Sequence, residues 1–405
     1  MAINVKVGSF TKKTSTGSQS TAHGLGTTPA MLIMWSAKKT TAGSFGTEYA
    51  ISFGFTDGAT SRCIANTAQD ADDTPSTAAR ARTSLICLID AGVGITITGE
   101  ATFTSWDATN FTLNWITADA NAHIIHFMAI SGVSAKVVEW AKNGTTGNQT
   151  VTGVGFASDV VLHLTNDAAA IPGEGSGMNF TFGAMDAYGN QWAVTNTGLT
   201  RDPSEVSRGQ RTNRCLYDIL TDETVYFEAT YVSMNLDGFT VNFSTCTSTE
   251  PVISLCINGL KAYVGNFNKS TGGAPVSQAI TGVPISTTKR GLFLASFQRT
   301  STSSPQTEAR LGLGASDGST EGAVALQAQD AVGTSNTDGI SKTDKVFVKV
   351  NNTTPAVDAE ADFTSFDSEG FTINWTTNDA VAAQILYLLL ADSSAGRVSG
   401  GGILG

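Results

Sequence analysis

The segments Phe111-Thr112-Leu113-Asn114-Trp115 and Phe371-Thr372-Ile373-Asn374-Trp375 alternate large apolar side chains with polar ones. A third segment, Phe239-Thr240-Val241-Asn242-Phe243, has the same pattern. A period of two places the apolar side chains on one face of a β-strand and the polar side chains on the other. Each segment therefore predicts a half-buried strand that contributes three large side chains to a core.

The spacing of these segments indicates an internal repeat. Phe111 and Phe239 are 128 residues apart, and Phe239 and Phe371 are 132 residues apart. Two further anchors recur in the same order at spacings of 129 to 131 residues: Gly24-Leu25-Gly26, Gly153-Val154-Gly155 and Gly282-Val283, then Gly54, Gly183 and Gly314. Three anchors in one order predict three diverged copies of one module of about 130 residues.

The expected fold is all-β, with three tandem antiparallel β-sandwich modules. We place the modules at residues 1–132, 133–261 and 262–392, followed by a Gly/Ser-rich C-terminal arm at 393–405. Short apolar runs separated by turn residues predict about six to eight strands per module. Because the linkers are only a few residues long, we expect the modules to touch in a pseudo-threefold ring rather than to form an extended rod.

Composition excludes several classes of partner. The 405-residue chain has a formal net charge of −11, and its lysines and arginines form no basic stripe, so nucleic acid is not an expected partner. No apolar run is long enough to cross a membrane, and the N-terminus lacks the pattern of a secretion signal. We therefore expect no membrane insertion, and synthesis in a cytoplasm without a signal peptide.

The five cysteines are an odd number and are expected to be reduced core thiols. Cys87 and Cys215 each precede an aligned phenylalanine, Phe111 or Phe239, by 24 residues. The same offset in the third copy falls on Phe347. This count predicts one core position that holds Cys, Cys and Phe, as expected of an apolar site rather than a ligand.

Motifs for catalysis are missing from the sequence. The four histidines form no metal-ligand spacing, and His123 and His126 would lie on opposite faces of a strand. The sequence contains no nucleophile elbow, phosphate loop or zinc motif, and no pair of carboxylates can be nominated for glycoside hydrolysis. The expectation is a protein that is not an enzyme and uses no cofactor or metal.

Asp57, Asp186 and Asp317 are acidic residues that occupy one position in all three copies. One interpretation is a hairpin turn, in which Asp accepts local hydrogen bonds and a following Gly adopts positive φ. The other is a contact with a ligand, a calcium ion or a partner at a loop tip. For the acidic cluster 70–73 a solvated loop is favoured over calcium binding.

Three other residues are candidates for contacts outside the chain. Trp192 follows the Asp186 turn, and this context makes it the strongest of the six tryptophans for exposed recognition, whereas Trp115 and Trp375 are expected in the core. The arm at 393–405 ends in the apolar pair Ile403 and Leu404. We expect this arm to become ordered on a partner subunit, with a plain disordered end as the alternative.

The strand pair from Gly370 to Asp379 and on through 383–391 resembles the closing strands of small sandwich modules in bacteriophage tail and head-surface proteins. More loosely, it is similar to the end of H-type lectin domains. The resemblance implies a non-enzymatic structural protein of a virion, such as a capsid decoration, collar or tail component, that contacts other virion proteins within an oligomeric assembly. The alternative it implies is a host-surface adhesin that binds glycan through lectin-like modules.

Overall fold

The computed structural model describes residues 2–90, 96–300 and 304–393. Within these ranges the chain forms 33 strands and no helix, and the paired strands of every sheet run antiparallel. The all-β antiparallel class predicted from the sequence is confirmed.

One pair of sheets occurs three times along the described chain, and we call the three pairs units 1, 2 and 3. Each unit has eleven strands, more than the roughly six to eight expected. Unit 1 consists of β1 (Asn4–Thr11), β2 (Gly17–Ala22), β3 (Met31–Ser36), β4 (Phe45–Thr47), β5 (Tyr49–Thr56), β6 (Ser61–Ala68), β7 (Thr77–Arg82), β8 (Ile86–Asp90), β9 (Thr96–Trp106), β10 (Asn110–Ala118) and β11 (Ile124–Ser131). Unit 2 consists of β12 (Ser134–Ala141), β13 (Gly147–Thr152), β14 (Val160–Thr165), β15 (Gly173–Gly175), β16 (Met178–Asp186), β17 (Gln191–Leu199), β18 (Glu205–Arg211), β19 (Leu216–Ile219), β20 (Val225–Asn235), β21 (Gly238–Cys246) and β22 (Pro251–Asn258). Unit 3 consists of β23 (Leu260–Asn268), β24 (Val276–Ile280), β25 (Lys289–Ser296), β26 (Gln306–Thr307), β27 (Ala309–Ser316), β28 (Glu321–Ala328), β29 (Thr337–Lys342), β30 (Phe347–Val350), β31 (Val357–Asp367), β32 (Gly370–Thr377) and β33 (Gln384–Asp392).

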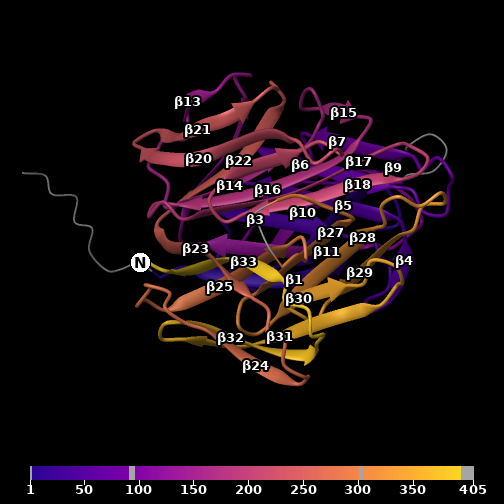
Figure 1. The fold of residues 1–405 in the computed structure, drawn as a ribbon. Helices are drawn as coiled ribbons and strands as arrows, with labels where there is room; N and C mark the ends of the chain where they lie inside the picture. The colour runs from indigo at the N-terminus through magenta and orange to yellow at the C-terminus, as the bar shows by residue number, and fades with distance from the viewer. Residues whose placement is uncertain (1, 91–95, 301–303, 394–405) are drawn as a thin grey trace, which may run out of the picture.

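In each unit a seven-stranded sheet faces a four-stranded sheet. The orders in unit 1 are β1-β11-β3-β5-β6-β7-β15 and β2-β10-β9-β8, and units 2 and 3 repeat both orders with the equivalent strands. Figure 1 shows two of the four-stranded sheets at opposite edges of the molecule, β13-β21-β20 at the top and β24-β32-β31 at the bottom. The boundary expected between residues 261 and 262 lies inside β23.

The last strand of each seven-stranded sheet comes from a different unit. Strand β15 of unit 2 pairs with β7 of unit 1, β26 of unit 3 pairs with β18 of unit 2, and β4 of unit 1 pairs with β29 of unit 3. The exchange therefore closes a cycle. It also covers three sheet edges that would otherwise present unpaired backbone groups to solvent.

The seven-stranded sheets are buried on both faces, which explains their continuous apolar runs. In β3, Met31, Ile33 and Trp35 face a central core shared by all three units, while Leu32 and Met34 face the four-stranded sheet of unit 1. The half-buried strands predicted from the alternation belong to the four-stranded sheets, where each has only one buried face. Continuous apolar runs therefore form strands buried on both faces, and alternating segments form strands buried on one face.

Three phenylalanine rings meet in the central core, one from each unit. The ring centroid of Phe53 lies 4.9 Å from that of Phe182 and 5.8 Å from that of Phe293, and the last two are 5.8 Å apart. Trp35 packs edge-on against Phe293, with their centroids 5.3 Å apart. The position of Trp35 is taken by Ala295 in unit 3, so one large ring from unit 1 fills space that a second tryptophan would overfill.

The repeated glycines are required by the close approach of two sheets. A Cβ atom added to Gly54, Gly183 or Gly314 would lie within about 2 Å of a backbone carbonyl oxygen. These oxygens belong to Leu85, Cys215 and Val346, which are therefore equivalent positions.

The grouping of Cys87, Cys215 and Phe347 as one position is therefore wrong. All three side chains are buried, but the hairpins that follow them differ in length, so counting back from the phenylalanines loses the register. All five cysteines are buried and have free thiols, as expected. Burial raises the pKa of the Cys63, Cys215 and Cys256 thiols to about 12, so these groups stay protonated at neutral pH.

Candidate functional site

The repeated aspartates lie where one unit meets the next. Asp57 Oδ1 accepts hydrogen bonds from the backbone N–H groups of Ala59 and Thr60, at 2.8 and 2.6 Å, which confirms the hairpin-turn interpretation. Its other oxygen, Oδ2, accepts a bond of 2.9 Å from the N–H of Val137, on the first strand of unit 2. The carboxylate thus forms a turn and joins two units at once.

The same contact recurs at the other two junctions. Asp186 Oδ2 accepts from the N–H of Val264 in unit 3 at 2.9 Å, and Asp317 Oδ2 accepts from the N–H of Val7 in unit 1 at 3.0 Å. The three aspartates therefore form a cycle of contacts from each unit to the next. The partner that they bind is the chain itself.

The junctions differ in the residue that precedes each valine. Lys6 Nζ lies 3.2 Å from Asp317 Oδ2, and Lys136 Nζ lies 3.9 Å from Asp57 Oδ2. At the junction of units 2 and 3 this position holds Tyr263. Burial raises the pKa of Asp186, although hydrogen bonds from Asn190 and Val264 oppose the shift. At Asp317 burial acts in the same direction, but hydrogen bonds from Val7 and Thr320 outweigh it and lower the pKa.

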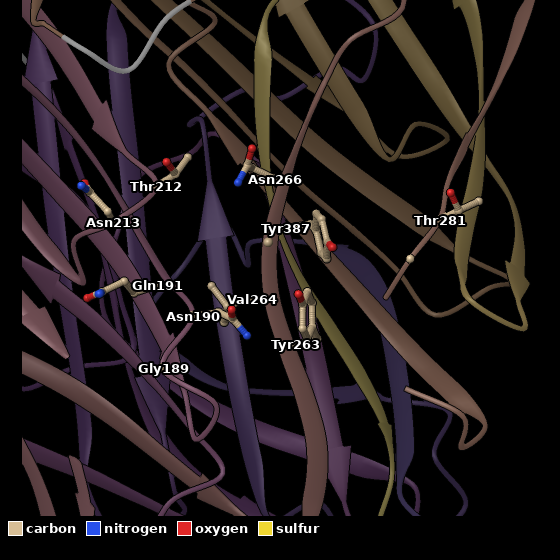
Figure 2. A pocket seen from close by; sticks show the side chains of 12 residues that line it. Gly189, Asn190, Gln191, Thr212, Asn213, Tyr263, Val264, Asn266, Thr281 and Tyr387 are labelled. Carbon is tan, nitrogen blue, oxygen red and sulfur yellow. The ribbon is translucent and has the colours of Figure 1, made fainter. Parts of the chain in front are cut away.

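A cleft of about 390 Å³ opens at the junction of units 2 and 3. Five segments line it: 189–191 between β16 and β17, 212–213 after β18, 263–266 on β23, 281–282 after β24, and Tyr387 on β33. In Figure 2 the asparagine, glutamine and threonine side chains of unit 2 lie on one side of the cleft, and the two tyrosines of unit 3 lie opposite them.

The floor of the cleft is aromatic. The rings of Tyr263 and Tyr387 are stacked, with centroids 6.3 Å apart and planes inclined by 27°. A Cβ atom on Gly265 would come within 2.4 Å of the Tyr387 ring, so only glycine lets this ring lie across β23. Behind Tyr387, the Nε1 atom of Trp192 donates a hydrogen bond of 3.0 Å to its carbonyl oxygen.

Three amide side chains on the wall are each held at one end. Gln191 Oε1 accepts from the N–H of Tyr231 at 2.7 Å, and Asn266 Oδ1 accepts from Gln384 Nε2 at 3.0 Å. Asn190 donates through Nδ2 to the Asp186 carboxylate. Among the described residues, the opposite end of each amide has no hydrogen-bond partner. The rim therefore offers donors and acceptors in fixed positions.

Charged side chains do not line this cleft within the described part of the chain. The corresponding cleft between units 3 and 1, of about 260 Å³, is lined by Lys6, Lys289, Arg290 and Asp317. Between units 1 and 2, Arg62 forms an ion pair of 2.8 Å with Glu139. Among the described residues, charged side chains therefore lie at the junction of units 3 and 1 and at the junction of units 1 and 2. The cleft between units 2 and 3 has an uncharged lining.

The expectation that Trp192 is exposed is wrong. Its side chain is only 1% exposed, because it lies on β17 facing the central core and not in the preceding turn. Ile403 and Leu404, and with them the expected arm, lie outside the described residues.

The acidic cluster 70–73 lies in a partly exposed loop, as expected, and two of its aspartates also join units. Asp70 Oδ1 accepts from the N–H of Thr337, and Asp73 Oδ1 accepts from the hydroxyl of Thr334, both in unit 3. Equivalent bonds run from Val206 N–H to Asp330 and from Thr77 N–H to the Thr200 hydroxyl. In the described ranges no group of three or more His, Cys, Asp or Glu side chains is arranged to hold a metal ion, and no helix could span a membrane.

The cleft residues Tyr263, Tyr387 and Asn266 were not found from the sequence. One sequence signal points to Tyr263. When the first strands of the three units are aligned on Val7, Val137 and Val264, the preceding residue is lysine in units 1 and 2 and tyrosine in unit 3.

Comparisons with known proteins identify no family. No protein-family model matches the sequence, and no curated protein matches it. Among solved structures, the fructofuranosidase from Schwanniomyces occidentalis complexed with fructose aligns with 6% sequence identity and a TM-score of 0.14, over 95% of this chain and 98% of that chain. A TM-score this low carries no argument about fold or function.

Proposed function

We propose that the chain is a non-enzymatic structural protein of a bacteriophage virion, such as a capsid decoration, collar or tail component, that acts through contacts with other virion proteins. The observation that carries the proposal is an apolar, exposed hairpin tip present in unit 2 alone among the three equivalent hairpins. The virion is proposed as the assembly because of the resemblance of the closing strands to phage sandwich modules.

The hairpin tip is formed by Val232 and Leu236 on the β20–β21 hairpin. Leu236 is 90% exposed and Val232 is 42% exposed. The equivalent exposed positions are Thr104 and Ala108 in unit 1, and Thr364 and Ser368 in unit 3. An exposed leucine retained at a single tip fits a buried anchor in a protein interface better than a general feature of the fold.

Because the three units are joined in a closed cycle, the tip can serve as a single attachment point in an assembly. A trimer of identical chains would present the tip three times, whereas three linked units can present it once. Strand exchange and the aspartate contacts hold the units in fixed positions, so the tip has a defined place relative to the other two units. Such a body can join a symmetric assembly in one orientation.

The proposal is tested by incorporation into particles. The double variant Val232→Asp with Leu236→Asp should bind purified particles lacking the protein at least tenfold more weakly than the wild type, because a charge cannot enter a desolvated anchor site. The matched control is Thr104→Asp with Ala108→Asp, at the same positions of unit 1. Equal binding by both double variants, or no binding of the wild type to particles, would refute the proposal.

A further inference from the structure

We propose that the cleft between units 2 and 3 binds a neutral carbohydrate, with one sugar ring lying against Tyr263, whose ring is stacked on the buried Tyr387. The inference does not depend on the virion proposal, because it rests on the cleft and not on the Val232 and Leu236 tip. It assigns a ligand class to the one version of the junction that carries no charged lining among the described residues.

The charge pattern selects an uncharged ligand. A cationic ligand would find no exposed carboxylate, because Asp186 is fully buried and its oxygens are taken by Tyr188, Asn190 and Val264. An anionic ligand would find no lysine, because Tyr263 stands where the other junctions have Lys6 and Lys136. A molecule that binds here must therefore gain its affinity from hydrogen bonds and from contact with the ring of Tyr263.

The polar groups match sugar hydroxyls. Each hydroxyl donates one hydrogen bond and accepts others, and amide groups offer both functions at fixed positions. The free ends belong to Asn190, Gln191 and Asn266, and the side chains of Thr212, Asn213 and Thr281 add further groups. Because the first three amides are already anchored at the opposite end, little side-chain entropy is lost on binding.

Tyr263 supplies the apolar contact that a sugar ring needs on its C–H face, and Tyr387, which is only 4% exposed, supports it by stacking. An aromatic ring with a hydroxyl group combines an apolar face with a polar edge. In Figure 2 the side chain of Tyr387 lies below and to the right of Asn266, and Tyr263 lies below Tyr387. The volume of about 390 Å³ lies at the small end of the range for ligand pockets, which fits one or two sugar units.

The equivalent positions of unit 1 indicate which substitutions the cleft positions can accept. Tyr263→Lys and Asn266→Ser install residues that unit 1 carries at the same positions, Lys6 and Ser9, so they should leave the fold intact. The lysine can also approach Asp186 as Lys6 approaches Asp317. Lys6→Tyr is the control. It makes the reverse exchange, from lysine to tyrosine, at the equivalent position in the junction of units 3 and 1.

The test uses the full chain on an array of neutral and acidic glycans, followed by titration with the neutral oligosaccharide that binds best. We expect binding of neutral glycans, at least tenfold weaker binding for Tyr263→Lys and Asn266→Ser, and unchanged binding for Lys6→Tyr, with unchanged Tm for all three. Binding of acidic glycans only, no glycan binding, or wild-type affinity of both cleft variants would overturn the inference. None of these outcomes depends on particle incorporation.

Discussion

Asp317 Oδ2 accepts a hydrogen bond of 3.0 Å from the backbone N–H of Val7, which lies 310 residues earlier in the chain. The bond joins the third unit to the first strand of the molecule and completes the cycle begun by Asp57 and Asp186. Thr320 strengthens it, because its hydroxyl donates a bond of 2.6 Å to the carbonyl oxygen of Val7. The N-terminal strand is thus held by unit 3 as well as by its own sheet.

Replacing Asp317 with alanine should loosen this closure. The variant leaves the Val7 N–H without its partner and removes the turn acceptor for Ser319 and Thr320. We expect a loss of about 1 to 3 kcal/mol in the free energy of unfolding. Hydrogen exchange should become faster at Val7 and leave the β31–β32 hairpin unchanged.

Asp222→Ala is the control that distinguishes the loss of a turn hydrogen bond from the loss of the contact between units. Asp222 also accepts a hydrogen bond from a backbone N–H two residues later, that of Thr224, but has no bond to another unit in the described structure. It should lower stability less than Asp317→Ala and leave exchange at Val7 as in the wild type. If the two variants behave alike, the contact with Val7 contributes nothing.

The central phenylalanines should couple the stability of all three units. Phe182→Ala removes a ring that packs against Phe53 of unit 1 and Phe293 of unit 3, and should cost about 3 to 5 kcal/mol. Phe182→Leu should cost less than about 1.5 kcal/mol, because unit 3 already uses Leu313 at this position. Denaturant unfolding should remain one transition in both variants, and a separate transition for unit 2 would contradict the shared core.

A single unit should not form a stable monomer. The segment 1–132 alone would expose the face of Met31, Ile33 and Trp35 that packs in the shared core, and its β7 edge would lose β15. An exposed apolar face and an open edge both promote self-association. Light scattering on the purified segment should show trimers or larger species, and a folded monomer would argue against a core that needs all three units.

The local parts of the fold were predictable from the sequence. Phe111, Leu113 and Trp115 are 0%, 0% and 1% exposed, as their alternation indicates, because strand period is a property of adjacent residues. Likewise, Asp57 and Asp317 form the predicted turns with neighbours two or three residues away.

What the sequence did not reveal depends on other units. Trp192 was expected in solvent because it follows a turn, but the ring is buried by β33 of unit 3, about two hundred residues later. The second role of each aspartate likewise needs two units in contact. A single sequence contains no pattern that pairs Asp186 with Val264, since neither residue type is unusual where it stands.

Glu321 should make stability depend on pH. It occupies the position of Gln191 in unit 2, and both side chains accept a hydrogen bond from an equivalent backbone N–H, that of Phe363 at 2.9 Å or Tyr231 at 2.7 Å. Burial, chiefly, raises the pKa of Glu321 to about 8 from an ordinary value of 4.5, and its Oε2 atom has no hydrogen-bond partner among the described residues. The folded protein therefore holds a proton that the unfolded chain releases near pH 4.5.

The sign of the effect follows from this difference in proton binding. Because the folded state binds more protons between pH 4.5 and 8, its stability from this group is complete below pH 4.5 and is lost as pH rises toward 8. Glu321→Gln keeps the acceptor and removes the charge, so it should match the wild type at pH 4.5. At pH 8.5 it should be more stable by about 1 kcal/mol, a figure reduced for solvent screening. Glu369→Gln, on an exposed turn, is the control, and unfolding curves at both pH values decide the outcome. A constant difference between Glu321→Gln and the wild type across this range would show that Glu321 does not titrate there.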